Sequence, residues 1–467
     1  MARAPVQTDS ALDWRLLSSL CLFSFLVNCK PSEPFLTDYL LTTKNFTEAE
    51  LAIEVWPWST FGAFVLLLPF GFAAEIIGSR PLILVGLLCR EATRVLLIFG
   101  TSLPEMAVMQ STYAAGRAAD AIYFAYVYAV APPSAYATLT SLVIAAFHAG
   151  NVVGATLGQV LVWTLPSWQQ DKTPLFVLSL VFVSLALPAF AMLPPPCRKL
   201  PPSLASLVIG PKPRDACVEL AALWRPRTSR LWLCWFLLAG SGHAVVGNYF
   251  QLQLAQTEAA DVPFGALEAA IELGLVLGAL SAAAGPVARI ARSQPAAFLV
   301  GTSIARAAAL GFSAAGADAG IALLPFTFNV VAFAIYALQQ AAGSAALART
   351  VVSSTDRTAV LFSANTLVAY AGAAVLGWVG AIAGWDSANA YYMTAAVLMV
   401  VIAIMAPLLS VGTRDEDAES LLTCINVPRP PSSSIGTATG NESGAGAFGE
   451  GHTEEWQPEA ASVRGAG

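Results

Sequence analysis

Charge is scarce in this sequence of 467 residues. Only 12% of the residues are charged, 56% are hydrophobic and the mean hydropathy is +0.65. A typical soluble domain carries about 25% charged residues, so a set of ordinary water-soluble domains is excluded. The formal net charge of −6 also argues against a nucleic-acid partner, which would require a basic surface.

Clusters of metal-binding or catalytic residues are also lacking. The 7 cysteines and 3 histidines show no CxxC or His-pair spacing, so neither a disulfide framework nor a metal site is predicted. The sequence has no HExxH, no P-loop Gly-Lys-Ser/Thr and no nucleophile paired with a base at a useful spacing. We therefore expect a protein that is not an enzyme and has no cofactor.

Long apolar runs, in contrast, are abundant. A bilayer core is about 30 Å thick and requires roughly 20 apolar residues per span. These spans must be helices, because lipid cannot hydrogen-bond to free backbone groups. We predict an all-α polytopic membrane protein with twelve transmembrane helices, over residues 14–41, 54–75, 81–100, 105–131, 136–163, 174–193, 230–255, 263–287, 295–315, 320–349, 357–383 and 388–410.

The basic residues lie mainly in one set of loops. Lys and Arg accumulate on the cytoplasmic side of membrane proteins. If the N-terminus is inside, the outer loops carry only Lys44 and Lys172. The inner loops and their flanks carry Arg80, Arg198, Lys199, Lys212, Arg214, Arg225, Arg227, Arg230, Arg289, Arg292, Arg349 and Arg357. This asymmetry predicts that both termini are cytoplasmic.

The longest inner loop divides the chain into two halves. Residues 1–193 form a predicted N-terminal six-helix bundle, residues 194–229 a cytoplasmic central loop and residues 230–410 a C-terminal six-helix bundle. Residues 411–467 are acidic and rich in Gly, Ser and Pro, which predicts a disordered cytoplasmic tail. Two six-helix halves joined by a basic inner loop indicate the major facilitator superfamily fold.

A short motif between the second and third spans supports this fold. Gly71, Glu75, Gly78 and Arg80 follow the superfamily's loop pattern of a glycine, an acid, a second glycine and a base. We expect a tight turn at Gly78, with Glu75 and Arg80 as a charge latch between helix ends. The alternative is an ordinary turn followed by a cytoplasmic Arg.

Ionisable residues within the spans are site candidates, because a charge at membrane depth is costly unless it is paired or hydrated. Glu33 lies between Pro31 and Pro34, which break a helix and leave carbonyl groups free. We expect a broken first span that presents this carboxylate to a substrate. The alternative is a solvated glutamate near the outer surface.

Asp120 lies within the fourth span, on one helical face with Tyr123 and Phe124. A carboxylate beside aromatic rings can bind an organic cation by charge attraction and cation–π contact. Alternatively, Arg117, one turn earlier, neutralises Asp120 as an internal pair.

Other charges within the spans have two interpretations each. Arg90, Glu91 and Arg94 in the third span suit a salt-bridge network between helices, with Arg94 able to reach Asp120; an anion site built on Arg94 and Arg117 is the rival. In the eighth span, Glu268 and Glu272 are one turn apart and suit a proton-responsive pair, or else hydrated carboxylates. His148 and His243 are weaker proton-relay candidates, and Arg306 is a candidate structural partner of these acids.

Several segments resemble the reduced folate and thiamine carrier family. The first span carries the most specific match, Lys30-Pro31-Ser32-Glu33-Pro34-Phe35-Leu36-Thr37, followed by Tyr39-Leu40 and Lys44-Asn45-Phe46-Thr47. Further matches are Glu54 with Pro57, Leu67-Leu68-Pro69, residues 120–130, Gly154, Leu157, Gln159, Asn248-Tyr249 with Gln251, residues 265–269, Asp356-Arg357, Phe362 and Asn365-Thr366. The resemblance implies a plasma-membrane vitamin carrier that works by alternating access, and it extends over about residues 15–405.

The resemblance also implies a substrate class. The folate branch has an Arg where this chain has Asp120, whereas the thiamine branch has an acid, so thiamine is the implied substrate. The implied substrate-binding residues are Glu33, Trp56, Asp120, Tyr123, Phe124, Asn248, Tyr249 and Phe264. Coupling or gating candidates are Glu75, Arg80, Arg94, Arg117 and Glu268.

The chain also departs from the family pattern. Ser59 replaces a family Trp, Phe264 replaces a family Asn, and Arg90, Glu91, Arg94 and Arg117 are additions. Two other substrates therefore stay open: pyridoxine, and a folate or organic anion bound by Arg94 and Arg117. A different function also stays open, that of a membrane receptor that signals through its tail. The expected partners are a small vitamin and the lipid bilayer, and we expect the carrier to be a monomer. Protonation of an acid such as Glu268 or Glu75 is one way in which transport would be coupled to pH.

A glycosylation sequon, Asn45-Phe46-Thr47, follows the first span. It falls on the predicted outer side, where glycosylation takes place. We therefore expect Asn45 to be glycosylated.

Overall fold

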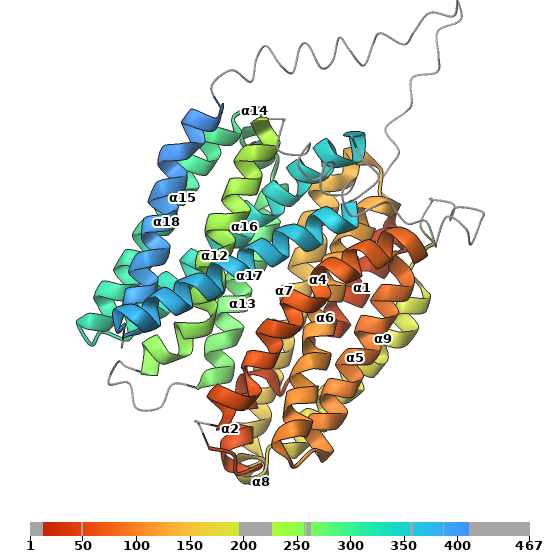
Figure 1. The fold of residues 1–467 in the computed structure, drawn as a ribbon, viewed down its shortest axis with the longest axis vertical. Coiled ribbons are helices and arrows are strands. Elements are labelled where there is room, and N and C mark those ends of the chain that lie inside the picture. The colour runs from red at the N-terminus through yellow and green to blue at the C-terminus, as the bar shows by residue number, and fades with distance from the viewer. Residues whose placement is uncertain are drawn as a thin grey trace, which may run out of the picture. The chain divides into compact units, whose positions relative to one another are not determined.

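The computed structural model describes residues 13–47, 50–195, 227–255, 257, 263–354, 358–385 and 387–410. Most of the predicted central loop, the predicted tail, and Asp356 with Arg357 lie outside the described residues. Almost every described residue is helical, as the composition predicts. Figure 1 shows the chain coloured from red at its N-terminus to blue at its C-terminus.

The N-terminal half, residues 13–195, contains the helices that correspond to the first six predicted spans. In chain order its elements are α1 (Trp14–Asn28), η1 (Glu33–Phe35), α2 (Leu36–Thr42), η2 (Leu51–Val55), α4 (Pro57–Ile77), α5 (Ser79–Phe99), α6 (Leu103–Val130), η3 (Pro133–Ala135), α7 (Tyr136–Thr164), α8 (Pro166–Gln170) and α9 (Thr173–Ala191).

The C-terminal half, residues 227–410, contains the helices of the last six predicted spans. In chain order they are α12 (Arg227–Ala255), α13 (Phe264–Ala283), α14 (Gly285–Ser293), α15 (Pro295–Asp318), α16 (Leu323–Ser354), α17 (Thr358–Ala383) and α18 (Ala388–Ser410). The short helix α14 follows α13 and is the one element of this half that is not a predicted span.

Nine of the described helices are long and apolar enough to cross a membrane. The other three predicted spans carry the features that make a simple hydropathy criterion fail. The first is broken, so α1 has only 15 residues. The other two are α5, which contains Arg90, Glu91 and Arg94, and α6, which contains Arg117 and Asp120. These three spans carry the candidate residues Glu33, Arg90, Arg94, Arg117 and Asp120.

The predicted turn between the second and third spans is confirmed. Helix α4 ends at Ile77 and α5 begins at Ser79, so one residue separates them. That residue, Gly78, has a φ angle of 91°, a conformation in which a side chain would be strained. We refer to the end of the bundle that contains Gly78 as the inner end, following the prediction from the basic loops.

The halves meet along two groups of helices. Helix α7 of the N-terminal half packs against α13 and α16, and α4 and α6 pack against α17. Helices α7 and α13 also lie side by side in Figure 1. Each half has its own core of buried apolar side chains, centred on Tyr126 and Leu139 in the first and on Trp235 and Leu310 in the second.

Candidate functional site

The break in the first span is the local feature from which the candidate site is built. Helix α1 ends at Asn28, residues 29–32 form a non-helical connection, and the chain continues through η1 into α2. Pro31 and Pro34 supply no backbone N–H groups here, so a continuous helix would lose two hydrogen bonds. The broken first span predicted from these prolines is confirmed.

A row of glycines on α7 receives this broken segment. A Cβ atom at Gly150 would lie 2.3 Å from the carbonyl oxygen of Phe25, and one at Gly158 would lie 2.2 Å from that of Pro31. A Cβ at Gly154, between them, would lie 2.6 Å from the backbone nitrogen of Lys30. We call Gly150, Gly154 and Gly158 the glycine row. Because a side chain at these positions would clash with that backbone, the glycine row allows residues 25–31, just before Glu33, to pack closely against α7.

The carboxylate of Glu33 is held between two cations. Its Oε2 atom lies 2.6 Å from Nη2 of Arg94 on α5, and its Oε1 atom lies 3.8 Å from Nζ of Lys30. Arg94 also donates a hydrogen bond of 3.4 Å to the hydroxyl of Ser32, which in turn is bound to Ser179 of α9. The network therefore ties the broken first span to two neighbouring helices.

Asp120 on α6 is paired with Arg90 and not with Arg117. Nη2 of Arg90 lies 2.5 Å from Oδ2 of Asp120 and also donates a hydrogen bond of 3.4 Å to the carbonyl of Gly116. The guanidinium of Arg117 instead lies 4.7 Å from the ring centre of Tyr370 on α17. The alternative in which Arg117 neutralises Asp120 is therefore wrong, and so is the predicted pairing of Arg94 with Asp120. Arg90 and Arg94 of α5 do form salt bridges to other elements, whereas Glu91 accepts a hydrogen bond from Ser184 of α9.

In both pairs the carboxylate is more accessible than the guanidinium. The side chain of Asp120 is 28% exposed and that of Glu33 is 23% exposed, against 8% for Arg90 and 4% for Arg94. The arginines thus lie behind the acids, where they orient and partly neutralise them. The charged atoms that an incoming molecule would meet first are carboxylate oxygens.

Helix α13 of the other half brings two more acids to this region. Oε2 of Glu272 lies 2.6 Å from Nδ1 of His148 on α7, which makes a polar link between the halves. Glu268, one turn earlier, has no hydrogen-bond partner among the described residues, and the charges of Glu272, Glu33 and Lys30 act on it. Helix α13 also contacts η1, so Glu268 faces the broken first span.

A second link joins α7 and α13 nearer the outer end. The backbone N–H of Gly265 donates a hydrogen bond of 2.9 Å to the side-chain oxygen of Gln159. Helix α13 has no side-chain cap of its own, because Pro263 precedes it. Gln159 therefore caps, from the other half, a helix end that would otherwise have a free donor.

The aromatic candidates of the N-terminal half differ in accessibility. The hydroxyl of Tyr123 donates a hydrogen bond of 2.6 Å to the carbonyl of Leu20, and its ring packs on Phe23, so it is buried in the core. Phe124 is half-buried and lies beside Phe147. Trp56, also half-buried, packs on the apolar cluster at the outer end. In this conformation Phe124 offers more open aromatic surface than Tyr123 does.

The candidates of the C-terminal half lie on two helices. Tyr249 on α12 stacks on Tyr391 of α18, with ring centres 4.2 Å apart, and its neighbour Asn248 is exposed. Phe264 is the first residue of α13 and is 40% exposed. Of these three, only Phe264 shares a helix with Glu268.

Glu75 and Arg80, the candidates at the inner end, each contact another part of the molecule. No ion pair joins the two of them among the described residues. Glu75 accepts a hydrogen bond of 3.1 Å from the backbone N–H of Ala359, at the start of α17. The guanidinium of Arg80 lies 5.3 Å from the ring centre of Phe190 on α9. Glu75 thus joins the two halves, and Arg80 packs within its own half.

Sequence reasoning missed three partners in this site. Lys30 was not treated as a charge near Glu33, Arg90 was not assigned to Asp120, and His148 was not linked to Glu272. The glycine row, in contrast, left a readable signal, because three glycines spaced four residues apart mark a close helix contact. The described residues contain no group of three or more His, Cys, Asp or Glu side chains that could hold a metal ion.

Comparison with known proteins identifies relatives of the chain. The model of a family described as reduced folate carrier matches residues 13–201. Thiamine transporter 1 of Homo sapiens is 34% identical over 182 residues, which is 39% of this chain and 36% of the relative. The reduced folate transporter of Rattus norvegicus is 28% identical over 309 residues, which is 60% of each chain. The matched part of the human relative is thus about a third of its length.

Solved structures share the fold. The Escherichia coli fucose:proton symporter has a TM-score of 0.59 at 16% identity, with 84% of this chain and 98% of that chain covered. The human organic anion transporter MFSD10 has a TM-score of 0.59 at 17% identity, with 85% and 100% covered. A third structure, of FucP in the outward conformation, is described as a major facilitator superfamily transporter and has a TM-score of 0.53 at 16% identity. The predicted fold class is therefore confirmed.

Proposed function

We propose that this chain, which is related to the reduced folate and thiamine carriers, transports a cationic vitamin across the plasma membrane, with thiamine as the favoured substrate. The substrate would bind between the two halves, against Glu33 and Asp120. The halves would then rock about this site and open it first to one side of the membrane and then to the other.

The observation that carries this proposal is the order of charges in the two ion pairs. Glu33 and Asp120 are the accessible members, and their arginines are buried behind them. A guanidinium in this position fixes the orientation of the carboxylate, and an oriented carboxylate suits recognition of an organic cation. Glu268 adds a further carboxylate from the opposite half.

The contacts between the halves support alternating access. At the outer end they include the bond between Gln159 and Gly265, and at the inner end the bond between Glu75 and Ala359. The first bond joins neutral groups and contributes about 0.5–1.5 kcal/mol net, and a hydrogen bond to a carboxylate such as that of Glu75 contributes about 1.5–3 kcal/mol. Contacts of this strength can be broken on one side at a time.

One observation favours a second candidate, an organic anion such as a folate. Arg117 is exposed, lies over the ring of Tyr370 across the boundary between the halves, and has no carboxylate partner among the described residues. Arg94, the other residue of that hypothesis, is occupied by Glu33. The cation is therefore the better supported ligand.

Uptake of radiolabelled thiamine tests the proposal. Cells would express the wild type, Asp120→Asn or Asp120→Arg, and surface expression would be measured in parallel. We expect uptake to fall roughly tenfold or more in both variants, since a hydrogen bond to a charged group contributes about 1.5–3 kcal/mol. Excess thiamine should compete for wild-type uptake and excess folate should not.

The matched control is Asp38→Asn. Asp38 also forms an ion pair, with Lys172 at 2.5 Å, but this pair lies at the outer end of the same half. Uptake should survive this change. Competition by folate alone, or wild-type uptake in Asp120→Asn, would contradict the proposal.

A further inference from the structure

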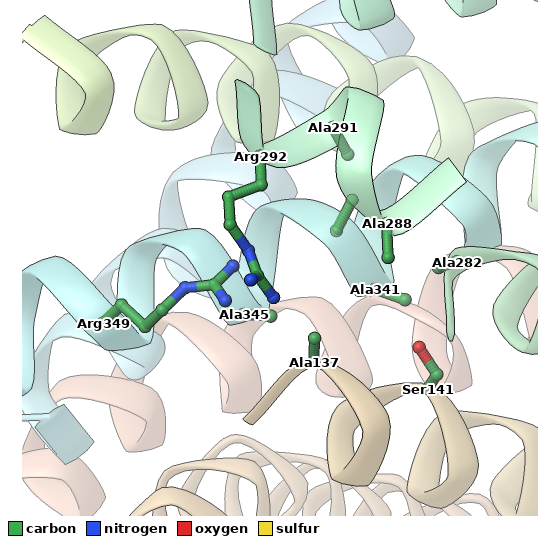
Figure 2. Close-up of a pocket in the computed structure, with 10 residues that line it drawn as sticks. Ala137, Ser141, Ala282, Ala288, Ala291, Arg292, Ala341, Ala345 and Arg349 are labelled. Atoms are coloured by element: carbon green, nitrogen blue, oxygen red, sulfur yellow. The ribbon is translucent and has the colours of Figure 1, made fainter. Parts of the chain in front are cut away.

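A pocket at the inner end is separate from the candidate substrate site. It is partly open to solvent and lies between α7 of the N-terminal half and α13, α14 and α16 of the C-terminal half. Most of its lining residues are alanines, and the polar ones are Ser141, Arg292 and Arg349. Figure 2 shows the two guanidinium groups next to one another, with the Ser141 hydroxyl across the pocket.

The charges in this pocket are unbalanced. None of the ten lining residues is acidic, and no carboxylate of the described residues forms an ion pair with Arg292 or Arg349. Arg292 is exposed, and its positive charge acts on Arg349, which is half-buried. Two like charges held together, one of them partly desolvated, repel each other unless an anion lies between them.

We infer that this pocket binds a phosphate group, carried either by a soluble cytoplasmic anion or by a lipid headgroup. Each guanidinium presents a planar fork of N–H donors that pairs with two oxygens. A carboxylate has only two oxygens and would satisfy one fork. A phosphate can accept from both forks and from the hydroxyl of Ser141, which has no hydrogen-bond partner among the described residues.

The ordinary role of a cytoplasmic arginine does not account for this arrangement. Arg289 lies one turn before Arg292 on α14, is exposed and fulfils the charge asymmetry of the loops, yet it does not line the pocket. Arg292 and Arg349 come from different helices and meet over a wall that includes α7. The site is therefore completed by both halves of the molecule.

A bound phosphate would join the halves at their inner end. Ser141 belongs to α7, whereas both arginines belong to the C-terminal half. The ligand would stabilise the conformation in which the inner end is closed and would slow the opening of that end. This last step rests on the proposed transport function, whereas phosphate binding itself does not.

Thermal unfolding of the purified full-length protein tests the binding. We expect inorganic phosphate to raise the Tm of the wild type and of Arg289→Gln, compared with chloride at equal ionic strength. The rise should be absent in the double variant Arg292→Gln/Arg349→Gln. Ser141→Val keeps both arginines but fills the pocket, so it should also lose the rise in Tm. This variant tests the inference even if the double variant does not fold.

Vesicles distinguish the two sources of phosphate. The protein would be reconstituted in phosphatidylcholine with or without phosphatidic acid. A Tm raised by free phosphate assigns a soluble ligand, and a Tm raised only by phosphatidic acid assigns a lipid headgroup. No rise with either probe, or an equal rise in the double variant, would overturn the inference. Because this readout needs no transport, it stays decisive even if thiamine uptake is not observed.

Discussion

The two halves treat buried polar groups differently. In the N-terminal half they include ion pairs, between Glu33 and Arg94 and between Asp120 and Arg90, beside neutral groups such as Ser32 and Ser179. In the C-terminal half the deepest polar groups are mostly neutral: Gln253, Ser313 and Asn329 are fully buried and hydrogen-bonded to one another.

Among the described residues of the C-terminal half, one cation is deeply buried, and it is accommodated in a third way. Arg306 is 1% exposed and has no carboxylate partner among the described residues. Its guanidinium lies 4.7 Å from the ring centre of Tyr336 and its Nη1 atom 3.5 Å from the sulfur of Met399. An aromatic face and a thioether thus replace an acid as its neighbours.

This difference indicates a division of labour. A neutral, fully hydrogen-bonded network fixes a packing arrangement without exposing charge. Ion pairs whose acids remain accessible leave charge available to a ligand. If the proposed function holds, the N-terminal half, with Glu268 and Glu272 at its boundary, supplies most of the charge that meets the substrate, and the neutral network of the C-terminal half supports the packing around it.

The largest expected effect comes from substituting one arginine in each half and comparing the two variants. Arg94→Gln leaves Glu33 without its closest cation, and loss of one partner of a buried pair costs roughly 3–5 kcal/mol. Thiamine uptake should therefore fall to background. Arg306→Met removes a charge that no acid balances, so uptake should stay near wild type. Equal loss in both variants, at equal surface expression, would end the comparison.

The next effect concerns the glycine row. Gly158→Ala places a Cβ atom against the carbonyl of Pro31, and overpacking of this kind costs roughly 1–3 kcal/mol. The Tm should fall and uptake should decrease because Glu33 moves. Gly311→Ala on α15 of the other half meets no atom within 4 Å and should leave the Tm unchanged or slightly higher. A stable Gly158→Ala protein with normal uptake would show that the contact is not needed.

A smaller effect is expected at the boundary between the halves. Nδ1 of His148 lies 2.6 Å from Oε2 of Glu272, so each side chain supports the contact of α7 with α13 through the other. His148→Gln and Glu272→Gln should therefore each reduce uptake, and the double variant should reduce it no further than either single variant does. Losses that add in the double variant, at equal surface expression, would remove this link from the mechanism.

The smallest effect is expected at Asn45, outside the membrane. Glycosidase treatment should increase the gel mobility of the wild type but not that of Asn45→Gln, and uptake should change little. The tail holds a second sequon, Asn441-Glu442-Ser443. If the predicted orientation holds, Asn441→Gln should not alter the glycosidase shift. A shift that depends on Asn441 would reverse the orientation.

Much of the fold could be predicted from the sequence. All twelve predicted spans correspond to helices, because an apolar run of about 20 residues has few other stable conformations in a membrane. The turn at Gly78 and the break near Pro31 were also predictable, since both depend on the backbone properties of a single residue.

The pairing within the site could not be predicted. By spacing, Asp120 is within reach of Arg90 and Arg94 of the preceding span and of Arg117 on its own helix. The rotation of α5 about its axis is what brings Arg90, and not Arg94, to Asp120. The link between His148 and Glu272 joins residues 124 positions apart and depends on how the halves meet. Local spacing contains no information on either, so the sequence could identify the charged residues but not their partners.

The cap that Gln159 places on α13 has a consequence for the resting molecule. The first turn of that helix relies on a neighbour that would withdraw whenever the outer end opens. The backbone amide hydrogens near Gly265 would then exchange with solvent more rapidly when the outer end is open. The rate of hydrogen exchange at the start of α13 would therefore report the fraction of molecules whose outer end is open, without a label attached to the protein.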